Sequence, residues 1–220
     1  MQPTKILIVL TSHGQFNSGA PTGYWLSEVT HFYAVITAAG FSADFISPAG
    51  GAAPMDPASR DSKALATIQA RVQTTLTPKQ INPSQYAAIY YPGGHGPLWD
   101  LTTNLEIATI ARKIYEAGGI VSAVCHGPAG LLPITLSNGN HLLTGKVVTG
   151  FSKFEERLAG KITEVPYILE EKLRGLAKRY TKALLPYLSH VEVDGRLITG
   201  QNPTSAKAVG IAVVQSLHQA

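Results

Sequence analysis

Short, almost purely apolar runs alternate with longer amphipathic stretches along the chain. An uninterrupted apolar run is typical of a strand that is buried on both faces of a parallel sheet. Such runs predict strands at residues 5–10, 41–47, 86–91, 120–124 and 146–149. Asp194-Gly195 is a strong turn signal between two further short runs, so a hairpin is predicted with strands at 191–193 and 197–199.

Helical periodicity fills the gaps between these runs. It predicts helices at residues 22–39, 62–75, 101–117, 128–136 and 204–217. Gly40 and the pair Gly118-Gly119 end two of these helices. Residues 152–182 are charged and are predicted to be helical, with a break near Pro166.

The order of these elements predicts an α/β fold. Alternation of strands and helices gives an open, mostly parallel sheet with helices on both faces. No repeat or linker divides the chain, so we predict one domain over residues 1–220, with surface decorations at about 48–85 and 152–182. Ligands of such sheets bind at the carboxyl ends of the strands, where candidate chemistry is therefore sought.

Composition and charge exclude several classes of protein. The chain has 220 residues, a formal charge of +4 and one cysteine, which excludes an intrachain disulfide and a cysteine-based zinc site. The positive excess is small and spread along the chain, so nucleic acid is not predicted as a partner. No apolar stretch reaches the roughly 18 residues of a membrane span, and the first ten residues resemble a strand more than a signal peptide. A cytoplasmic protein without a membrane partner is predicted.

The single cysteine follows a predicted buried strand directly. Cys125 comes after Val124 and before His126-Gly127-Pro128, where glycine permits a sharp turn and proline suits the start of a helix. A thiol at such a corner has the geometry of a nucleophile elbow, and the positive end of the next helix would favour its thiolate. The amide of His126 would face a developing oxyanion. A buried structural cysteine is the alternative interpretation.

Two further segments supply candidate chemistry. Tyr91-Pro92-Gly93-Gly94-His95-Gly96 also follows a predicted strand, and its glycines expose backbone amides, so Gly94 is a candidate second oxyanion donor. Glu28 lies in an otherwise apolar helical stretch. It is either on a solvated helix face or a buried carboxyl with a raised pKa that shares a proton with the sulfur. Spacing alone leaves both interpretations open.

Seven segments that together span nearly the whole chain resemble a known family. They read KILIVLTS, TGYWLSEVTHFY, AAGFSADFISPAGG, YYPGGHGPLWDL, GGIVSAVCHGPAGLL, LLTGKVVTGFSKFEE and DGRLITGQNPTSA. They resemble the ThiJ/PfpI superfamily, whose flavodoxin-like sandwich fold is related to that of class I glutamine amidotransferases. The AVCHGP elbow indicates the superfamily. TGYWLSEVTHFY and TGQNP point to the heat-shock chaperone-like branch with glyoxalase III activity.

The resemblance implies roles for several residues. Cys125 would be the nucleophile, His126 its acid/base, and Glu28 the carboxyl that hydrogen-bonds the sulfur. Gly94 and the His126 amide would form the oxyanion hole. Glu156 matches the family's third triad member, although the neighbouring Glu155 is one residue away. The resemblance also implies a homodimer that needs no metal and no organic cofactor.

The activity implied is the conversion of methylglyoxal or glyoxal to the hydroxy acid, with stress protection or protein deglycation as related roles. A pocket for a small dicarbonyl is expected to have aromatic walls, and Tyr24, Trp25 and Trp99 are candidates, each of which could instead be a core or interface residue. His95 is a further candidate substrate contact. Both His95 and His31 could simply line the cleft.

Two other classes of function stay open. In a redox-sensing stress chaperone, Cys125 would be oxidised and would not act as a catalytic nucleophile. Exposed apolar surface would carry out the chaperone function. A cysteine peptidase, amidase or hydratase would use the same elbow, although a peptidase needs an open groove that the two decorations are expected to narrow. A true glutamine amidotransferase is disfavoured, because only His190-Val191-Glu192 imitates its downstream His-x-Glu pattern and the rest of its context is missing.

Overall fold

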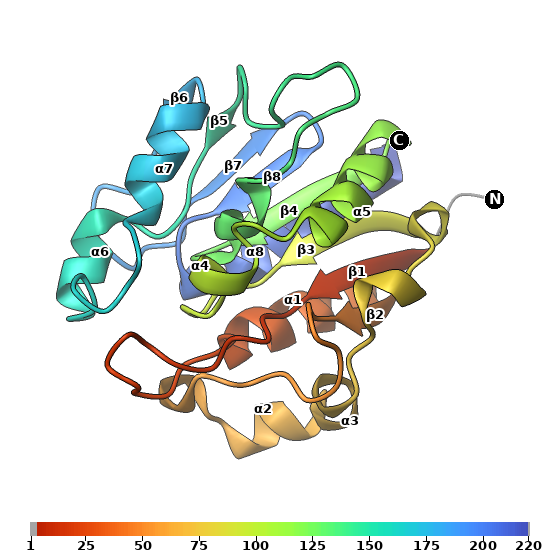
Figure 1. The fold of residues 1–220 in the computed structure, drawn as a ribbon. Coiled ribbons are helices and arrows are strands. Elements are labelled where there is room, and N and C mark those ends of the chain that lie inside the picture. The colour runs from red at the N-terminus through yellow and green to blue at the C-terminus, as the bar shows by residue number, and fades with distance from the viewer. Residues whose placement is uncertain (1–3, 220) are drawn as a thin grey trace.

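A computed structural model describes residues 4–219 and has a six-stranded sheet at its centre (Figure 1). The strand order is β2-β1-β3-β4-β8-β7. Neighbouring strands are parallel except for the last pair, the predicted hairpin, in which β7 runs antiparallel to β8. The strands span Lys5–Val9 (β1), Ser42–Ile46 (β2), Tyr86–Tyr91 (β3), Ile120–Val124 (β4), Val191–Asp194 (β7) and Leu197–Gly200 (β8).

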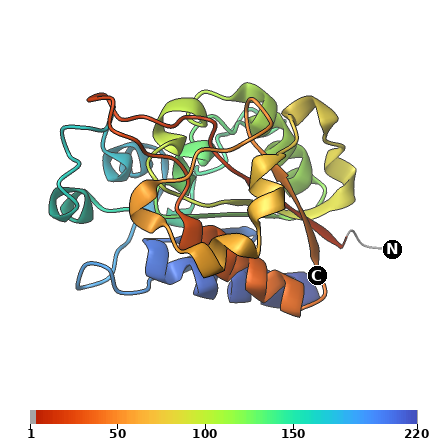
Figure 2. The same cartoon turned by 90° about the horizontal axis from the view of Figure 1, so that it is seen from below.

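Helices cover both faces of the sheet, as predicted (Figures 1 and 2). Helices α1 (Leu26–Ala38) and α8 (Ala206–Gln219) pack together on one face, and α5 (Leu105–Glu116) covers the other. Successive side chains of a strand point to opposite faces. In β1, Ile6 therefore packs towards α1 and α8, whereas Leu7 packs towards α5. This burial on both faces explains the continuous apolar runs of the sequence.

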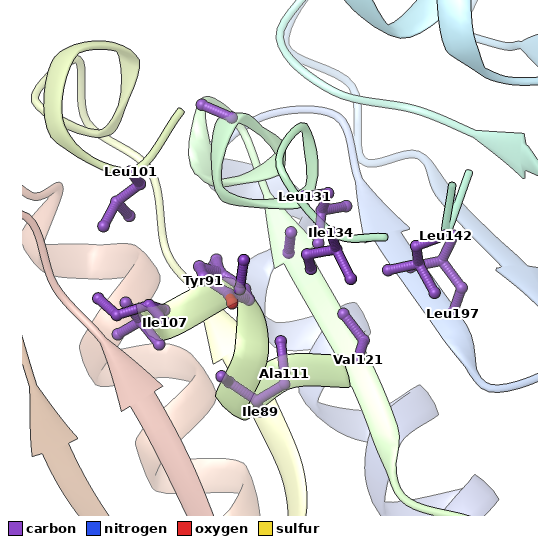
Figure 3. Close-up of a cluster of buried hydrophobic side chains, with 14 of the residues drawn as sticks. Ile89, Tyr91, Leu101, Ile107, Ala111, Val121, Leu131, Ile134, Leu142 and Leu197 are labelled. Carbon is purple, nitrogen blue, oxygen red and sulfur yellow. The ribbon is translucent and has the colours of Figure 1, made fainter. Parts of the chain in front are cut away.

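The α5 face shows how sequence periodicity becomes packing. Ile107 and Ala111, one turn apart on α5, belong to one buried cluster with Ile89 of β3 and Val121 of β4, and Ala111 lies beside both strand residues (Figure 3). All four side chains are buried. Asn104 caps the helix, since its side chain accepts the N–H of Ile107, and α5 therefore begins at Leu105 and not at the predicted residue 101.

The remaining helices and strands are short and lie in the two decorations and the connections. They are η1 (Pro57–Ser59), α2 (Ser62–Ala66), α3 (Gln69–Gln73), η2 (Pro78–Gln80), η3 (Pro83–Gln85), α4 (Pro97–Asp100), η4 (Gly127–Leu131), β5 (Val147–Val148), α6 (Lys153–Leu158), α7 (Leu169–Leu176), β6 (Arg179–Tyr180) and η5 (Pro203–Ser205).

Two predicted helices in the N-terminal half differ from the structure. The segment 22–25 is extended and not helical, because the N–H groups of Tyr24 and Trp25 donate to Pro54 and Gly93 carbonyls in other segments. Helix α1 consequently begins at Leu26, which places Glu28 in its first turn. The helix predicted at 62–75 is divided into α2 and α3, since Ile68 leaves the helical region between them.

Two predicted elements after the cysteine are also shorter. The helix predicted at 128–136 is the five-residue 3₁₀-helix η4, and Pro133 follows shortly after its end. The strand predicted at 146–149 contains only Val147–Val148, and it pairs with Arg179–Tyr180 in a separate two-stranded sheet. The charged region 152–182 is helical only in α6 and α7, with the predicted break between them.

Within residues 4–219, no helix has the length and apolar character needed to cross a membrane. The single domain predicted over residues 1–220 includes residues 1–3 and 220, which lie outside the described residues. The extent of that domain stays a prediction.

Candidate active site

Cys125 lies at a strained corner between β4 and η4. Its φ angle is +59°, in the left-handed region that non-glycine residues rarely adopt, at a cost of roughly 1–3 kcal/mol. Backbone hydrogen bonds hold this geometry: the Cys125 N–H donates to the Gly200 carbonyl at 3.0 Å, and the Cys125 carbonyl accepts the Phe151 N–H at 2.8 Å. Gly127 completes the turn, since a Cβ there would lie 1.9 Å from the Tyr91 carbonyl oxygen. The predicted elbow is present.

His126 links the thiol to a carboxylate. Its Nδ1 lies 3.4 Å from the Sγ of Cys125, and its Nε2 lies 2.7 Å from Oε2 of Glu156. Burial would raise the pKa of Glu156, but the adjoining imidazoles of His126 and His95 outweigh it and lower that pKa below its ordinary value. Because an ionised carboxylate only accepts hydrogen bonds, the Nε2 of His126 donates. In the neutral imidazole this leaves a bare Nδ1 facing the thiol.

Glu156 also binds a second histidine. The Nε2 of His95 lies 3.0 Å from Oε1 of Glu156, and the His95 and His126 ring centroids are 4.3 Å apart. Burial, and then the neighbouring His126, lower the pKa of His95 despite the Glu156 contact. The rings of Phe16 and Phe151 surround the pair, at 5.0 Å from His95 and 4.5 Å from His126 respectively.

Glu28 is fully buried and faces the thiol, which decides between the two interpretations of the sequence. Its Oε2 accepts the N–H of Gly93 at 2.5 Å. Its Oε1 has no hydrogen-bond partner among the described residues. Burial raises the pKa of Glu28 to about 8, against the opposing effects of the Gly93 N–H and the Cys125 thiol. The carboxyl is therefore mostly protonated at neutral pH.

The thiol itself is not poised as a thiolate, which corrects an expectation drawn from the sequence. Burial raises the pKa of Cys125, and the adjacent Glu28 raises it further, while the Gly94 N–H lowers it. The following helix η4 has five residues, too few for a substantial helix dipole, so its positive end does not offset these effects. The resting site holds a thiol beside a carboxylic acid.

Backbone amides border the sulfur. The Gly94 N–H hydrogen-bonds Cys125, and Gly94 has a φ of +87°. A Cβ on Gly93 would lie 2.6 Å from the His126 nitrogen and 2.8 Å from the Cys125 Cβ, so the glycine loop and the elbow are in close contact. The Gly94 amide therefore lies at the sulfur, and the His126 nitrogen lies against the same glycine loop.

The structure separates the two neighbouring glutamates of α6. Glu155 forms a capping box with Ser152, and its other oxygen accepts the Tyr187 N–H and the Asn202 side-chain amide, each at 2.9 Å. Both carboxylate oxygens of Glu155 therefore accept hydrogen bonds that fix the start of α6 and the loop at Tyr187. Glu156, and not Glu155, contacts His126.

The other side chains selected from the sequence lie in different surroundings. Tyr24 is buried in the core of the α1 face, where burial raises its pKa to about 12. Trp25 is half-buried and its backbone binds the glycine loop at Gly93. Trp99 stacks on His13 at 4.7 Å, and His31 is exposed on α1, outside the group around Cys125.

Sequence reasoning missed three aromatic neighbours of the histidines. Phe16 packs on His95, Phe151 packs on His126, and Tyr187 packs on Phe151. Phe151 had a usable signal, because it comes two residues after the strand predicted at 146–149. Tyr187, whose φ is +59°, had no such signal in the sequence. Its loop is held near the site by the hydrogen bond from the Tyr187 N–H to the Glu155 carboxylate. Among residues 4–219, the group able to hold a metal ion is His95, His126 and Glu156.

The fold and the site together define a class of α/β protein with a mostly parallel sheet, a thiol on a strained elbow, an adjoining histidine and carboxylate, and a glycine loop that follows the neighbouring strand. Family comparison gives the class a name. Residues 9–216 match the DJ-1/PfpI family, and the chain belongs to it. The predicted ThiJ/PfpI membership and flavodoxin-like fold are confirmed.

Three similar proteins narrow the comparison. The chain is 33% identical to the Saccharomyces cerevisiae protein named glutathione-independent glyoxalase HSP31, over 99% of each chain. The structure of the present chain resembles that of the Francisella tularensis Rapid Encystment Protein 24 KDa, with a TM-score of 0.92, 36% identity and 99% of each chain covered. It also resembles Candida albicans glyoxalase III, with a TM-score of 0.88, 25% identity and 97% of each chain covered.

Proposed function

We propose that this protein is a glutathione-independent glyoxalase that converts methylglyoxal or glyoxal to the hydroxy acid through a covalent adduct on Cys125. The observation that carries the proposal is the position of His126: Nδ1 lies 3.4 Å from the sulfur while Nε2 is anchored on Glu156. One imidazole can therefore exchange protons with the sulfur and with whatever carbon is bonded to it. The similarity to HSP31 and to glyoxalase III supports this activity.

Addition is the first chemical step. The sulfur of Cys125 attacks the aldehyde carbon of methylglyoxal, and its proton passes to the bare Nδ1 of His126. His126 then passes this proton to the aldehyde oxygen, which gives a neutral hemithioacetal and leaves Nδ1 bare again. Glu28, which is mostly protonated at neutral pH, keeps its proton beside the sulfur. The Gly94 and His126 amides stabilise the oxyanion before it is protonated.

Isomerisation follows within the same adduct. A base removes the proton from the carbon bonded to sulfur, giving an enediolate, and the proton is returned to the neighbouring carbon. The hydroxyl proton moves from the oxygen of the first carbon to the oxygen of the second. The product is the lactoyl thioester of Cys125, with no net change in electrons between substrate and adduct. His126 is the base in reach of that carbon, and Glu156 stabilises its protonated ring. Water then hydrolyses the thioester, releasing lactate and the free thiol.

The burial of the site favours a small substrate over a polypeptide. Cys125 is 3% exposed, His126 is 1% exposed and Glu28 is fully buried. Loop residues also meet above the cluster: the Lys161 ammonium lies 4.4 Å from the centre of the Phe16 ring that contacts His95. An extended peptide cannot reach this thiol without displacing such contacts. This favours the glyoxalase over the peptidase and over deglycation of folded proteins.

The redox-sensor alternative has less support. Sensor cysteines are typically accessible and have a lowered pKa. Cys125 is buried, and burial and Glu28 raise its pKa. The homodimer and the cytoplasmic location stay predictions, drawn from the resemblance and from the single cysteine.

The test is conversion of methylglyoxal to lactate, followed by proton NMR in chelator-treated buffer without glutathione. We expect turnover by the wild type and none above background by Cys125→Ser. A casein substrate tests the peptidase alternative in parallel. Peptide cleavage without lactate formation, or equal lactate formation by both proteins, would overturn the proposal.

A further inference from the structure

One carboxylate at the site binds two imidazoles, and only one of them is used by the proposed chemistry. Glu156 accepts from His126 through Oε2 at 2.7 Å and from His95 through Oε1 at 3.0 Å. Orienting His126 requires a single hydrogen bond. The second histidine, His95, is 7% exposed and its Nδ1 has no partner within the described residues.

We propose that His95, His126 and Glu156 bind one Zn²⁺ ion, and that this ion inhibits the enzyme. One potential ligand atom from each residue lies within 4.8 Å of the other two. Two imidazole nitrogens and one carboxylate oxygen form a donor set that zinc prefers, with a fourth position left for water. Tetrahedral zinc ligands at about 2.0–2.2 Å from the metal lie about 3.3–3.6 Å from one another. The two histidine–carboxylate pairs, at 2.7 and 3.0 Å, would lengthen to this spacing, and the two imidazole ligand atoms already lie within 4.8 Å of each other.

The backbone holds these three ligands on rigid elements. His126 is fixed by the elbow at the end of β4, and His95 follows β3, the neighbouring strand. Glu156 lies in the first turn of α6, whose N-terminus is fixed by the Ser152–Glu155 capping box. A preformed set of this kind keeps the ordering cost of metal binding low.

The proton balance explains why such an ion would inhibit. Both Nε2 atoms now donate to Glu156, so each must lose its proton to coordinate zinc. In a neutral imidazole the proton moves to Nδ1, and no net charge is released. His95 has an unpartnered Nδ1 to receive it. In His126 the same shift turns Nδ1 from an acceptor for the thiol proton into a donor, which removes the base from Cys125.

The sulfur is not part of this site. Cys125 contacts Nδ1 of His126, whereas the ion would lie at Nε2, on the other side of the ring. This distinguishes the proposal from simple capture of zinc by a reactive thiol. The binding site itself does not depend on the proposed glyoxalase activity; only the inhibition does.

Calorimetric titration of chelator-stripped protein with Zn²⁺ tests the binding site without any turnover. We expect one site per chain in the wild type, and affinity within about threefold in Cys125→Ser. We expect at least a tenfold loss in His95→Gln, since even residues behind metal ligands typically cost 10–100-fold. His31→Gln, which alters an exposed histidine outside the group, is the matched control and should bind like the wild type.

Loss of binding in Cys125→Ser with retention in His95→Gln would overturn the proposal, as would the absence of a one-to-one site in the wild type. Co²⁺ binding to the wild type is a second measurement that does not require any variant to fold. Visible absorption typical of tetrahedral nitrogen and oxygen ligands is expected. A thiolate-to-cobalt charge-transfer band would place the ion on Cys125 and overturn the proposal.

Discussion

The carboxyl of Glu28 and the thiol of Cys125 face each other in the buried part of the site. Glu28 is fully buried and Cys125 is 3% exposed. Burial raises the cost of ionising either group, and the adjacent Glu28 raises the pKa of the thiol further. The resting pair therefore keeps its protons, and His126 is the group that can withdraw one when substrate arrives.

This pairing has a consequence for stability against pH. Burial raises the pKa of Glu28 from 4.5 to about 8, so the native state retains a proton that the unfolded chain releases. The stabilisation from Glu28 is fully present below pH 4.5 and is lost as pH rises to about 8, at up to about 1.4 kcal/mol per pH unit. Urea denaturation from pH 5 to 8.5 should show Glu28→Gln gaining stability relative to the wild type as pH rises.

The exposed Glu106 supplies the control for that comparison. Glu106→Gln should follow the wild-type curve. Parallel curves for Glu28→Gln and the wild type would show that Glu28 is ionised in the native protein throughout.

The pH dependence of Cys125 alkylation by iodoacetamide tests how Glu28 affects the pKa of the thiol. Burial and the Glu28 carboxyl raise the pKa of the thiol, so the rate should keep rising above pH 9, beyond the ordinary cysteine value of about 8.5. Glu28→Gln removes the negative charge and should react faster than the wild type at pH 9–10. A rate that is already constant below pH 7 would instead indicate a stabilised thiolate, as a redox sensor requires.

Glu155 and Glu156 should respond differently to the same substitution. Glu156→Gln removes the charge that orients and stabilises His126, and kcat should fall by about 10²–10⁴-fold. In Glu155→Gln, the side-chain NH₂ group replaces one carboxylate oxygen, so it faces a hydrogen-bond donor, either the Ser152 hydroxyl or the Tyr187 N–H, and that hydrogen bond is lost. The free energy of unfolding of this variant should fall by about 1–3 kcal/mol, with kcat within about tenfold of the wild type. Steady-state kinetics and urea denaturation of both variants give the comparison, and the opposite assignment of effects would contradict it.

The contact between the glycine loop and the elbow leaves no room for a side chain. In Gly93→Ala the new Cβ would meet the His126 nitrogen at 2.6 Å and the Cys125 Cβ at 2.8 Å, neither of which can move freely. The amides would separate from the sulfur, and kcat/KM should fall by at least about 10²-fold, the effect of losing one oxyanion donor.

Gly175→Ala is the matched substitution, since Gly175 lies in helix α7 and a Cβ there meets nothing within 4 Å. It should leave kcat/KM unchanged and raise the free energy of unfolding by about 0.5–1 kcal/mol. Equal kcat/KM values for the two alanine variants would contradict the role assigned to the glycine loop.

The parts of the fold and site that the sequence predicted are those with local signals. Continuous apolar runs identify the strands, and parallel strands end at one sheet edge, so Cys125 and the Gly93-Gly94 loop were expected together. The geometry of Glu28 had no local signal, because burial of that face of α1 depends on packing against the sheet and on the extended segment before Leu26.

Some information in the sequence was available but unused. Ser152 and Glu155 are spaced as a capping box, which assigns Glu155 to the helix start and leaves Glu156 for His126. The two-residue strand Val147–Val148 was not distinguishable from a central strand, because its partner at Arg179–Tyr180 is about thirty residues away and itself only two residues long. Such non-local pairing is decided by tertiary packing and not by local propensity.

Most of the proposed chemistry depends on the bare Nδ1 that His126 presents to Cys125. Nitrogen-15 NMR of histidine-labelled protein, assigned by comparison with His126→Gln, reports which ring nitrogen carries the proton. At neutral pH and without substrate we predict a protonated Nε2, bonded to Glu156, and an unprotonated Nδ1. A proton found on Nδ1 would contradict this mechanism, since His126 could then not accept the proton of the attacking thiol.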